Sequence, residues 1–314
     1  AIAIRIARSA AKNHKVAVCG YHGWHDWYLS ANLKIKDNLK NHLLPGLSTS
    51  GVPKNLKNTV FTFNYGNFEQ LKKIVNRHHI GVIKMEVSRG SLPDINFLKK
   101  VRKICDQKKI ILIFDECTSG FRRNFGGLHL TTGVNPDLAM FGKALGNGYA
   151  ITAVIGKKKI MEKASNSFIS STFWTERIGF AAALETLSEM KRLKSWKKIT
   201  MSGRFFNNEL KKIAKKIDLD LEISGIESIT SFKFNYKNHL AYKTFITQEM
   251  LKKGYLASNL IFFNIYHTTK VIKDYLIKLE KILLKIKHFE KNKIDPKKFL
   301  KSDICHETFK RLND

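Results

Sequence analysis

Short apolar runs alternate with segments of helical periodicity along this chain, and this alternation restricts the possible folds more than any other feature. Helices are predicted over residues 68–78 and 94–108, the second one capped by Asp94. Strands are predicted at residues 15–19, 59–64, 81–86, 110–114, 138–141 and 152–156. Strands that alternate with helices form a sheet covered on both faces, so the pattern predicts an α/β fold with a mostly parallel central sheet flanked by helices.

Several predicted strands end at residues that can take part in chemistry. Cys19, Glu86 and Phe141 end three of the runs, and Asp115 directly follows a fourth. In sheets of this kind, active sites lie outside the carboxyl ends of the strands. We therefore expect these residues to converge on one edge of the sheet.

The second half of the chain has a different pattern. A long helix is predicted over 176–192, followed by β-rich stretches at 219–235, a helix at 241–253, a strand at 256–266 and a helix at 269–289. At 314 residues the chain exceeds the usual size of a single domain. We expect a large domain over 1–192, a small α+β domain over 193–289, and a basic tail over 290–314.

The charge of the chain is strongly positive, with 56 Lys and Arg against 26 Asp and Glu. The lysines are scattered over every predicted helix, without a basic stripe or a nucleic-acid motif, so no nucleic-acid partner is expected. A positive field that attracts anionic cofactors and substrates remains as a role for the charge.

The remaining composition favours a cytoplasmic protein. The apolar runs are too short to span a bilayer, and no signal peptide is apparent, so no membrane association is expected. Four cysteines without paired or metal-like spacing suit a reducing compartment. His22 and His25, beside Asp26, are more typical of structural residues than of metal ligands, and no metal is expected.

Lys143 and Asp115 form the most informative pair in the sequence. Lys143 follows a short apolar strand and precedes small and glycine residues, and Asp115 lies 28 residues upstream at the end of a buried run. Pyridoxal phosphate (PLP) chemistry requires a lysine that holds the aldehyde and a carboxylate that keeps the pyridine nitrogen protonated. Each residue also has an ordinary interpretation, since lysines are abundant here and an aspartate after a strand is often a turn residue or a cap.

Three further segments accompany the segments that contain Asp115 and Lys143. The matching segments are residues 20–26 (GYHGWHD), 114–122 (FDECTSGFR), 141–148 (FGKALGNG), 170–176 (SSTFWTE) and 266–268 (YHT). In this order and spacing, the chain resembles the class III aminotransferases of the fold-type I PLP enzymes, a group that also contains glutamate-1-semialdehyde aminomutase. The resemblance covers residues 1 to about 289.

The resemblance implies a role for each matched residue. Lys143 would form the Schiff base with PLP and move the proton, and Asp115 would pair with the pyridine nitrogen. The other cofactor-binding residues that it implies are Tyr21 on the ring face, His22 as support for that stack or as an ordinary packed histidine, Gly23 for close backbone approach, Glu86 at its strand end, and Thr172 at the phosphate. Thr172 is expected to come from the neighbouring subunit, which implies a homodimer with shared active sites.

The function implied by this resemblance is amino-group transfer from a small-molecule amino donor to an aldehyde or keto acceptor. An aminomutase is the alternative within the family. However, Asn259 stands where aminomutases usually have glutamate, and Val87 stands where many relatives have proline. A helix is also predicted over residues 1–12, so the chain begins inside a helix, and relatives have a phosphate-binding loop just upstream of it. We therefore also expect an N-terminally truncated chain, and a catalytically inactive fragment is the third hypothesis.

Overall fold

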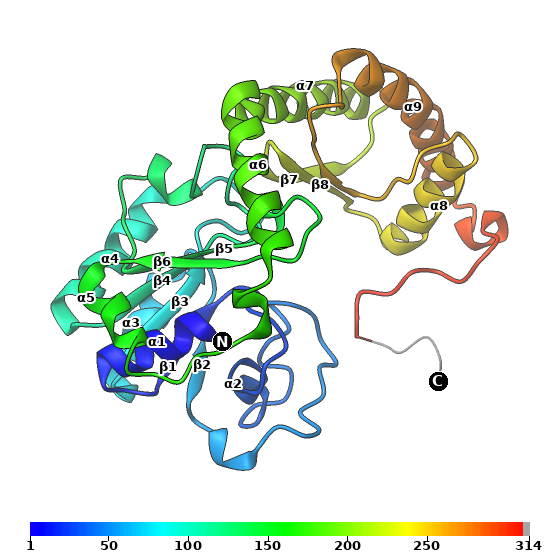
Figure 1. The fold of residues 1–314 in the computed structure, drawn as a ribbon. Coiled ribbons are helices and arrows are strands. Elements are labelled where there is room, and N and C mark those ends of the chain that lie inside the picture. Colours follow the sequence, from blue (N-terminus) through cyan, green and yellow to red (C-terminus); the bar gives the residue numbers. More distant parts are fainter. Residues whose placement is uncertain (310–314) are drawn as a thin grey trace. The chain divides into compact units, whose positions relative to one another are not determined.

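The computed structural model describes residues 1–309, which divide into two compact units. The first unit contains residues 1–89 and 93–189 together with 307–309, and the second contains residues 90–92 and 190–306. The units are described separately below, and most of their helices and strands are labelled in Figure 1.

The first unit is built on a six-stranded sheet with the strand order β2-β1-β3-β4-β5-β6. Its strands are β1 (Val16–Cys19), β2 (Val60–Thr62), β3 (Val82–Glu86), β4 (Ile111–Asp115), β5 (Leu138–Phe141) and β6 (Ala153–Gly156). The first five strands pair in parallel, and only β6 runs antiparallel to its neighbour β5. The predicted α/β fold with a mostly parallel sheet is confirmed.

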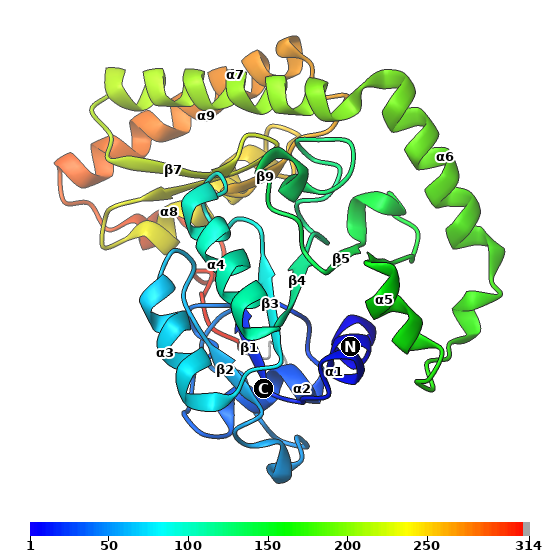
Figure 2. The same ribbon diagram turned by 90° about the vertical axis from the view of Figure 1, so that its left-hand side faces the viewer.

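Helices cover both faces of this sheet (Figure 2). On one face lie α1 (Ile2–Ala11) and α5 (Lys158–Met161), and on the other lie α3 (Phe68–His78) and α4 (Ile95–Lys108). The α1 helix packs a face of small and branched residues, among them Ile4 and Ala7, against Val16, Val18 and Ile113 of the sheet. The α4 helix begins as predicted, because the side chain of Asp94 accepts a hydrogen bond from the backbone N–H of Phe97 at 3.0 Å.

Short helical segments connect the main elements of the first unit. They are α2 (Asp26–Leu29), η1 (Ser30–Asn32), η2 (Lys54–Leu56), η3 (Leu128–Thr131), η4 (Lys143–Leu145), η5 (Glu162–Ala164) and η6 (Thr172–Trp174). The η4 segment directly follows β5, so it lies at the carboxyl edge of the parallel strands, where the sequence pattern places the site.

The second unit combines helices with a small antiparallel sheet. Its elements are α7 (Ser195–Lys216), β7 (Leu221–Ile226), β8 (Ile229–Phe234), α8 (His239–Leu251), β9 (Leu260–Phe262), α9 (Thr269–Lys291) and η7 (Pro296–Phe299), and α6 (Arg177–Leu193) leads into it. The three strands form an antiparallel sheet in the order β7-β8-β9. The strand expected at 256–266 is much shorter, and the long α7 helix is an addition to the predicted pattern.

The structure differs from the expected basic tail at 290–314. Pro296 is buried, and Ile294 and Leu300 pack against the apolar core of the second unit. The backbone N–H of Cys305 donates to Oγ1 of Thr244 at 3.0 Å. Residues 290–306 therefore belong to the second unit, because apolar residues between the lysines attach them to its core; residues 310–314 lie outside the described part of the chain. Within residues 1–309, no helix has both the length and the apolar character that crossing a bilayer demands.

Candidate active site

A cavity of about 410 Å³ lies at the carboxyl edge of the parallel strands. It receives side chains from the loop after β1, from the ends of β3 and β4, and from η4. The predicted site residues that line it are Tyr21, His22, Gly23, Glu86, Asp115 and Lys143. The fold thus brings together all of the predicted site residues except Thr172.

Asp115 is the best-anchored group in this cavity. It ends β4 in register with Glu86 of β3, and its side chain is 8% exposed. Its Oδ2 lies 2.9 Å from Nδ1 of His22, and its Oδ1 accepts the backbone N–H of Cys117 at 3.2 Å. Burial by itself would raise the pKa of Asp115, but the bond from His22 and the nearby ammonium of Lys84 outweigh it and hold the pKa well below its usual range. Asp115 is therefore a fixed negative charge.

His22 supports Asp115 as a neutral donor. Burial, and then the charge of Lys84, lower the pKa of His22 to about 4, against the opposing effect of its bond to Asp115. An ionised carboxylate only accepts hydrogen bonds, so Nδ1 of His22 carries the proton. Its Nε2 is buried and has no hydrogen-bond partner among the residues that the structure describes. The ring also contacts Tyr28 edge-on at 5.7 Å between centroids. His22 therefore orients the carboxylate.

Lys84 is a residue of the site that the sequence interpretation missed. It lies in the middle of β3 with a side chain that is 1% exposed, and its Nζ is 3.2 Å from Oδ2 of Asp115. A signal was present in the sequence, because a lysine interrupts an apolar strand that a parallel sheet buries on both faces. In a chain with so many lysines, this one did not stand out.

Lys143 opens η4 with an unusual backbone conformation. Its φ is 46°, a left-handed value that is uncommon for a residue other than glycine. Its Nζ donates a hydrogen bond to Oγ1 of Thr118 at 2.6 Å, and its side chain is exposed to the cavity. Lys143 thus presents a primary amine to the cavity from the turn that follows β5.

The carboxylate of Glu86 is paired with another side chain of the protein. It forms an ion pair with Arg89, whose guanidinium also donates to the carbonyl of His42 at 3.1 Å. Burial raises the pKa of Glu86, and Arg89 opposes this. Gly20 has a φ of 116°, and a Cβ on it would come within 2.9 Å of Cγ of Glu86. Glu86 therefore holds the loop after β1 in place, which makes it a support of the cavity wall.

Tyr21 and Gly23 form the outer wall of the cavity. The ring of Tyr21 is 41% exposed and meets Tyr28 edge-on, at 6.4 Å between centroids, so one of its faces remains available for stacking. Gly23 has a φ of 99°, which a residue with a side chain rarely adopts. The glycine at this position is therefore required by the backbone path of the loop.

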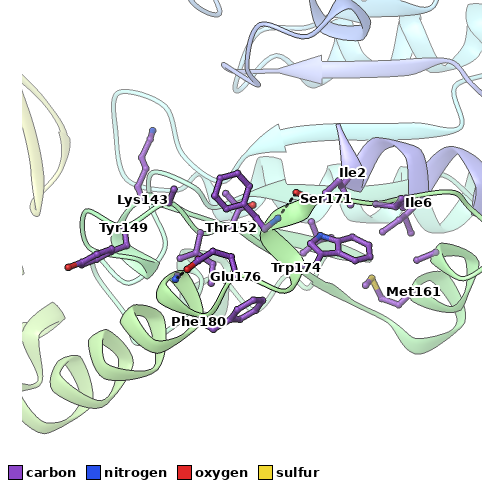
Figure 3. Close-up of a pocket in the computed structure, with 17 residues that line it drawn as sticks. Ile2, Ile6, Lys143, Tyr149, Thr152, Met161, Ser171, Trp174, Glu176 and Phe180 are labelled. Atoms are coloured by element: carbon purple, nitrogen blue, oxygen red, sulfur yellow. Dashed lines mark hydrogen bonds between the residues drawn. The ribbon is translucent and has the colours of Figure 1, made fainter.

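Thr172 lies outside the cavity in the described chain. It belongs to η6, is exposed, and its neighbours Ser171, Phe173 and Trp174 line an adjoining groove of about 690 Å³ that also reaches Lys143. Figure 3 shows Trp174 and Met161 at one end of this groove and Glu176 toward the end near Lys143. The groove is mostly apolar, with large side chains exposed along it.

The residues of the cavity fit one class of bound group. A buried anionic carboxylate, an amine and an exposed aromatic face suit a planar aldehyde whose ring nitrogen carries a proton. No three His, Cys, Asp or Glu side chains within residues 1–309 are placed to share a metal ion.

Comparisons with known proteins give the family context. A family model described as Aminotransferase class-III matches residues 2–290. The chain is 29% identical over 303 residues to the 3-aminobutyryl-CoA aminotransferase of Cloacimonas acidaminovorans, which covers 90% of this chain and 69% of that protein. It is 32% identical over 261 residues to the glutamate-1-semialdehyde 2,1-aminomutase of Methanosphaera stadtmanae, covering 79% of this chain and 59% of that protein. The chain therefore spans between about three fifths and two thirds of the length of these relatives.

Solved structures with the same fold include a protein in its PLP internal aldimine form and an omega-transaminase. The FumI protein of a Sphingopyxis species, in its PLP internal aldimine form, matches with a TM-score of 0.81 and 21% identity over 95% of this chain and 70% of that one. An omega-transaminase from Sphaerobacter thermophilus matches with a TM-score of 0.79 and 16% identity over 91% of this chain and 72% of that one. At these identities the likeness establishes the fold.

Proposed function

The chain belongs to the class-III aminotransferase family, and on this premise we propose that it transfers amino groups with PLP bound in the cavity around Asp115 and Lys143. The observation that carries the proposal is the buried, ionised carboxylate of Asp115 in the same cavity as the exposed amine of Lys143. PLP, when bound, supplies an aldehyde for the amino group and a ring that takes up an electron pair from the substrate carbon.

The residues of the chain have distinct tasks in this proposal. Asp115 holds a proton on the ring nitrogen by charge, and His22 fixes the orientation of that carboxylate. Tyr21 stacks on one face of the ring, and Gly23 shapes the loop that carries Tyr21. Nζ of Lys143 would hold the aldehyde of the cofactor and, as a free amine, would move a proton to and from the substrate carbon.

Glu86 has a narrower task than the sequence alone implies. Its ion pair with Arg89 and its packing on Gly20 support a role in holding the cavity wall beside the cofactor. Glu86 is therefore a cofactor-site residue in this proposal, and its carboxylate faces Arg89.

The proposal includes a homodimer. Thr172 is exposed, and the groove beside it carries Phe173 and Trp174 with more than half of each side chain exposed. A second copy that covers this groove would bury these rings, and it would place Thr172 at the cofactor phosphate of the partner subunit. Sedimentation of the purified chain tests this part, and a monomer at micromolar concentration with PLP bound contradicts it.

A cytoplasmic location is also part of the proposal. All four cysteines of the chain lie within the described residues and are free thiols, two of them buried. Free cysteines at this number suit a reducing compartment. Retention of the thiols in protein taken from oxidising and reducing hosts tests this point, and disulfide formation in the native fold contradicts it.

The test of the central proposal is the visible absorption of the chain incubated with PLP. The matched variants are Lys143→Ala and Lys157→Ala, since Lys157 is a lysine of the same unit that pairs with Asp137. We expect a visible band that disappears in the first variant, persists in the second, and is discharged by an amino donor. A band that does not depend on Lys143, or none at all, refutes the proposal and leaves a protein that keeps the fold without the chemistry.

An aminomutase is the second candidate, and the similarity to such enzymes, at 32% identity in one case, favours its inclusion. The two candidates differ in the fate of the amino group. An aminotransferase needs a separate carbonyl acceptor to return to its starting state, whereas an aminomutase completes the cycle on one substrate. Single-substrate turnover with glutamate-1-semialdehyde separates them.

A further inference from the structure

Lys84 is a fully enclosed lysine in the interior of a parallel sheet. It pairs in register with Val18 on one side and with Ile113 on the other, and its side chain is 1% exposed. Burying an ammonium group is strongly unfavourable unless an opposite charge and further contacts compensate. A lysine at such a position therefore calls for an explanation in terms of its partners.

The contacts of Lys84 converge on the carboxylate of the proposed cofactor site. Its Nζ lies 3.2 Å from Oδ2 of Asp115 and 5.3 Å from the ring centroid of Trp27. The same Oδ2 receives Nδ1 of His22 at 2.9 Å. Lys84 also lines the cavity that contains Asp115 and Lys143. Oδ2 of Asp115 thus contacts both a neutral hydrogen-bond donor, His22, and a positively charged ammonium, that of Lys84.

We propose that Lys84 is a positioning residue that competes with the ring nitrogen of the cofactor for Asp115, and so sets how strongly this carboxylate holds the ring proton. The inference rests on the proposed function and adds a residue to it. Asp115 provides one negative charge, and this charge attracts both the ammonium of Lys84 and a protonated ring nitrogen.

The competition follows from elementary electrostatics. A cation beside a carboxylate reduces the attraction that a second cation experiences there. His22 does not have this effect, because its low pKa keeps the ring neutral near pH 7. With Lys84 present, the ring nitrogen is less firmly protonated, and the ring becomes a more moderate electron sink. Removing the charge at position 84 makes the whole carboxylate charge available to the cofactor.

The experiment compares two cofactors in two proteins. One cofactor is PLP, and the other is its 1-deaza analogue, in which a C–H replaces the ring nitrogen while the aldehyde and phosphate remain. Dissociation constants of both are measured by titration of the wild-type chain and of the Lys84→Met variant, which keeps the length of the side chain and removes the charge. In the variant we expect the preference for PLP over the analogue to increase by about tenfold, the equivalent of a one-unit pKa shift.

The preference ratio separates this role from a structural one. A lysine that merely supports the fold affects both dissociation constants by the same factor, so an unchanged or decreased ratio overturns the inference. Lys84→Gln is the second variant if the methionine variant does not fold, and Lys157→Met, which removes a half-exposed ion pair of the same unit, is the control with an unchanged ratio. If the wild-type chain lacks a Lys143-dependent PLP band, the proposed function fails and this inference with it; if the band is present and the ratio is constant, only the inference about Lys84 fails.

Discussion

The pair formed by Asp115 and Lys84 allows a stability prediction that needs no cofactor. The change is Asp115→Asn, which keeps the size and the acceptor oxygen of the side chain and removes its charge. Lys84 then remains buried beside a neutral amide, with its side chain 1% exposed. The variant should therefore lose stability chiefly through the charge, with little loss of packing.

The size of the loss follows from the distance and the burial. Two unit charges 3.2 Å apart attract by about 5 kcal/mol at an effective dielectric constant of 20. Removing one member of a buried ion pair typically costs about 3–5 kcal/mol, because the other charge is left uncompensated. Side-chain exposures of 1% and 8% place this pair in that class. We predict that Asp115→Asn lowers the free energy of unfolding by about 3–5 kcal/mol.

The assay is urea unfolding of the cofactor-free chain, followed by tryptophan fluorescence, for Asp115→Asn, Lys84→Met and the double variant. Trp27 is buried and lies beside Lys84, so its emission reports on this region. The double variant removes both charges, and its loss should be smaller than the sum of the two single losses by well over 1 kcal/mol. Losses that add within about 0.5 kcal/mol would refute the reasoning, because they would mean that the two charges are not coupled.

Two other predictions concern the loop after β1. Gly20→Ala should lower the free energy of unfolding by about 2–5 kcal/mol, because Gly20 has a left-handed φ of 116° and an added Cβ would collide with Glu86. Gly66→Ala is the control, since Gly66 has a φ of 81° and open space around it, and it should lose only about 1–2 kcal/mol. Equal urea midpoints for the two variants would contradict this prediction. The lowered pKa of His22, about 4, means that the unfolded chain takes up a proton at this residue before the folded chain does as the pH falls from 6.5. Stability is thus lost between pH 6.5 and 4, by about 3 kcal/mol for this residue, and His22→Asn, which keeps a donor toward Asp115, should reduce that loss in unfolding measured across the window; an identical pH slope in both proteins would count against it.

The sequence was informative about the fold where burial leaves a simple pattern. The run that became β4 is apolar throughout because a parallel strand is covered on both faces, and Asp115 at its end was located correctly for the same reason. The α7 helix, Ser195–Lys216, was not among the predicted elements, although its buried residues recur at helical spacing, at Ile199, Gly203, Phe206, Leu210 and Ala214. The helix begins without a side-chain cap, so the usual sequence signal of a helix start is missing there.

The site could be predicted only in part from the sequence, since motifs identify residues but not their partners. Lys143 and Asp115 were found from the chemistry that they suit, and their place in one cavity follows from the sheet topology. The ion pair of Lys84 with Asp115 and the bond of Lys143 to Thr118 depend on side-chain directions that only the folded chain fixes. Thr172 differs from these residues, because its proposed partner belongs to a second copy of the chain.

The backbone at Lys143 has a consequence for how this protein tolerates change. With a φ of 46°, the position would accommodate glycine or asparagine more readily than lysine, at a difference of about 1 kcal/mol. The amino acid that the proposed chemistry demands is thus not the one that the turn prefers. Glycine or asparagine would relieve the same conformational cost at Lys12, Lys109, Lys194 and Lys293, whose φ values are 48–55°, but only at Lys143 would the replacement remove the amine that the proposed chemistry needs.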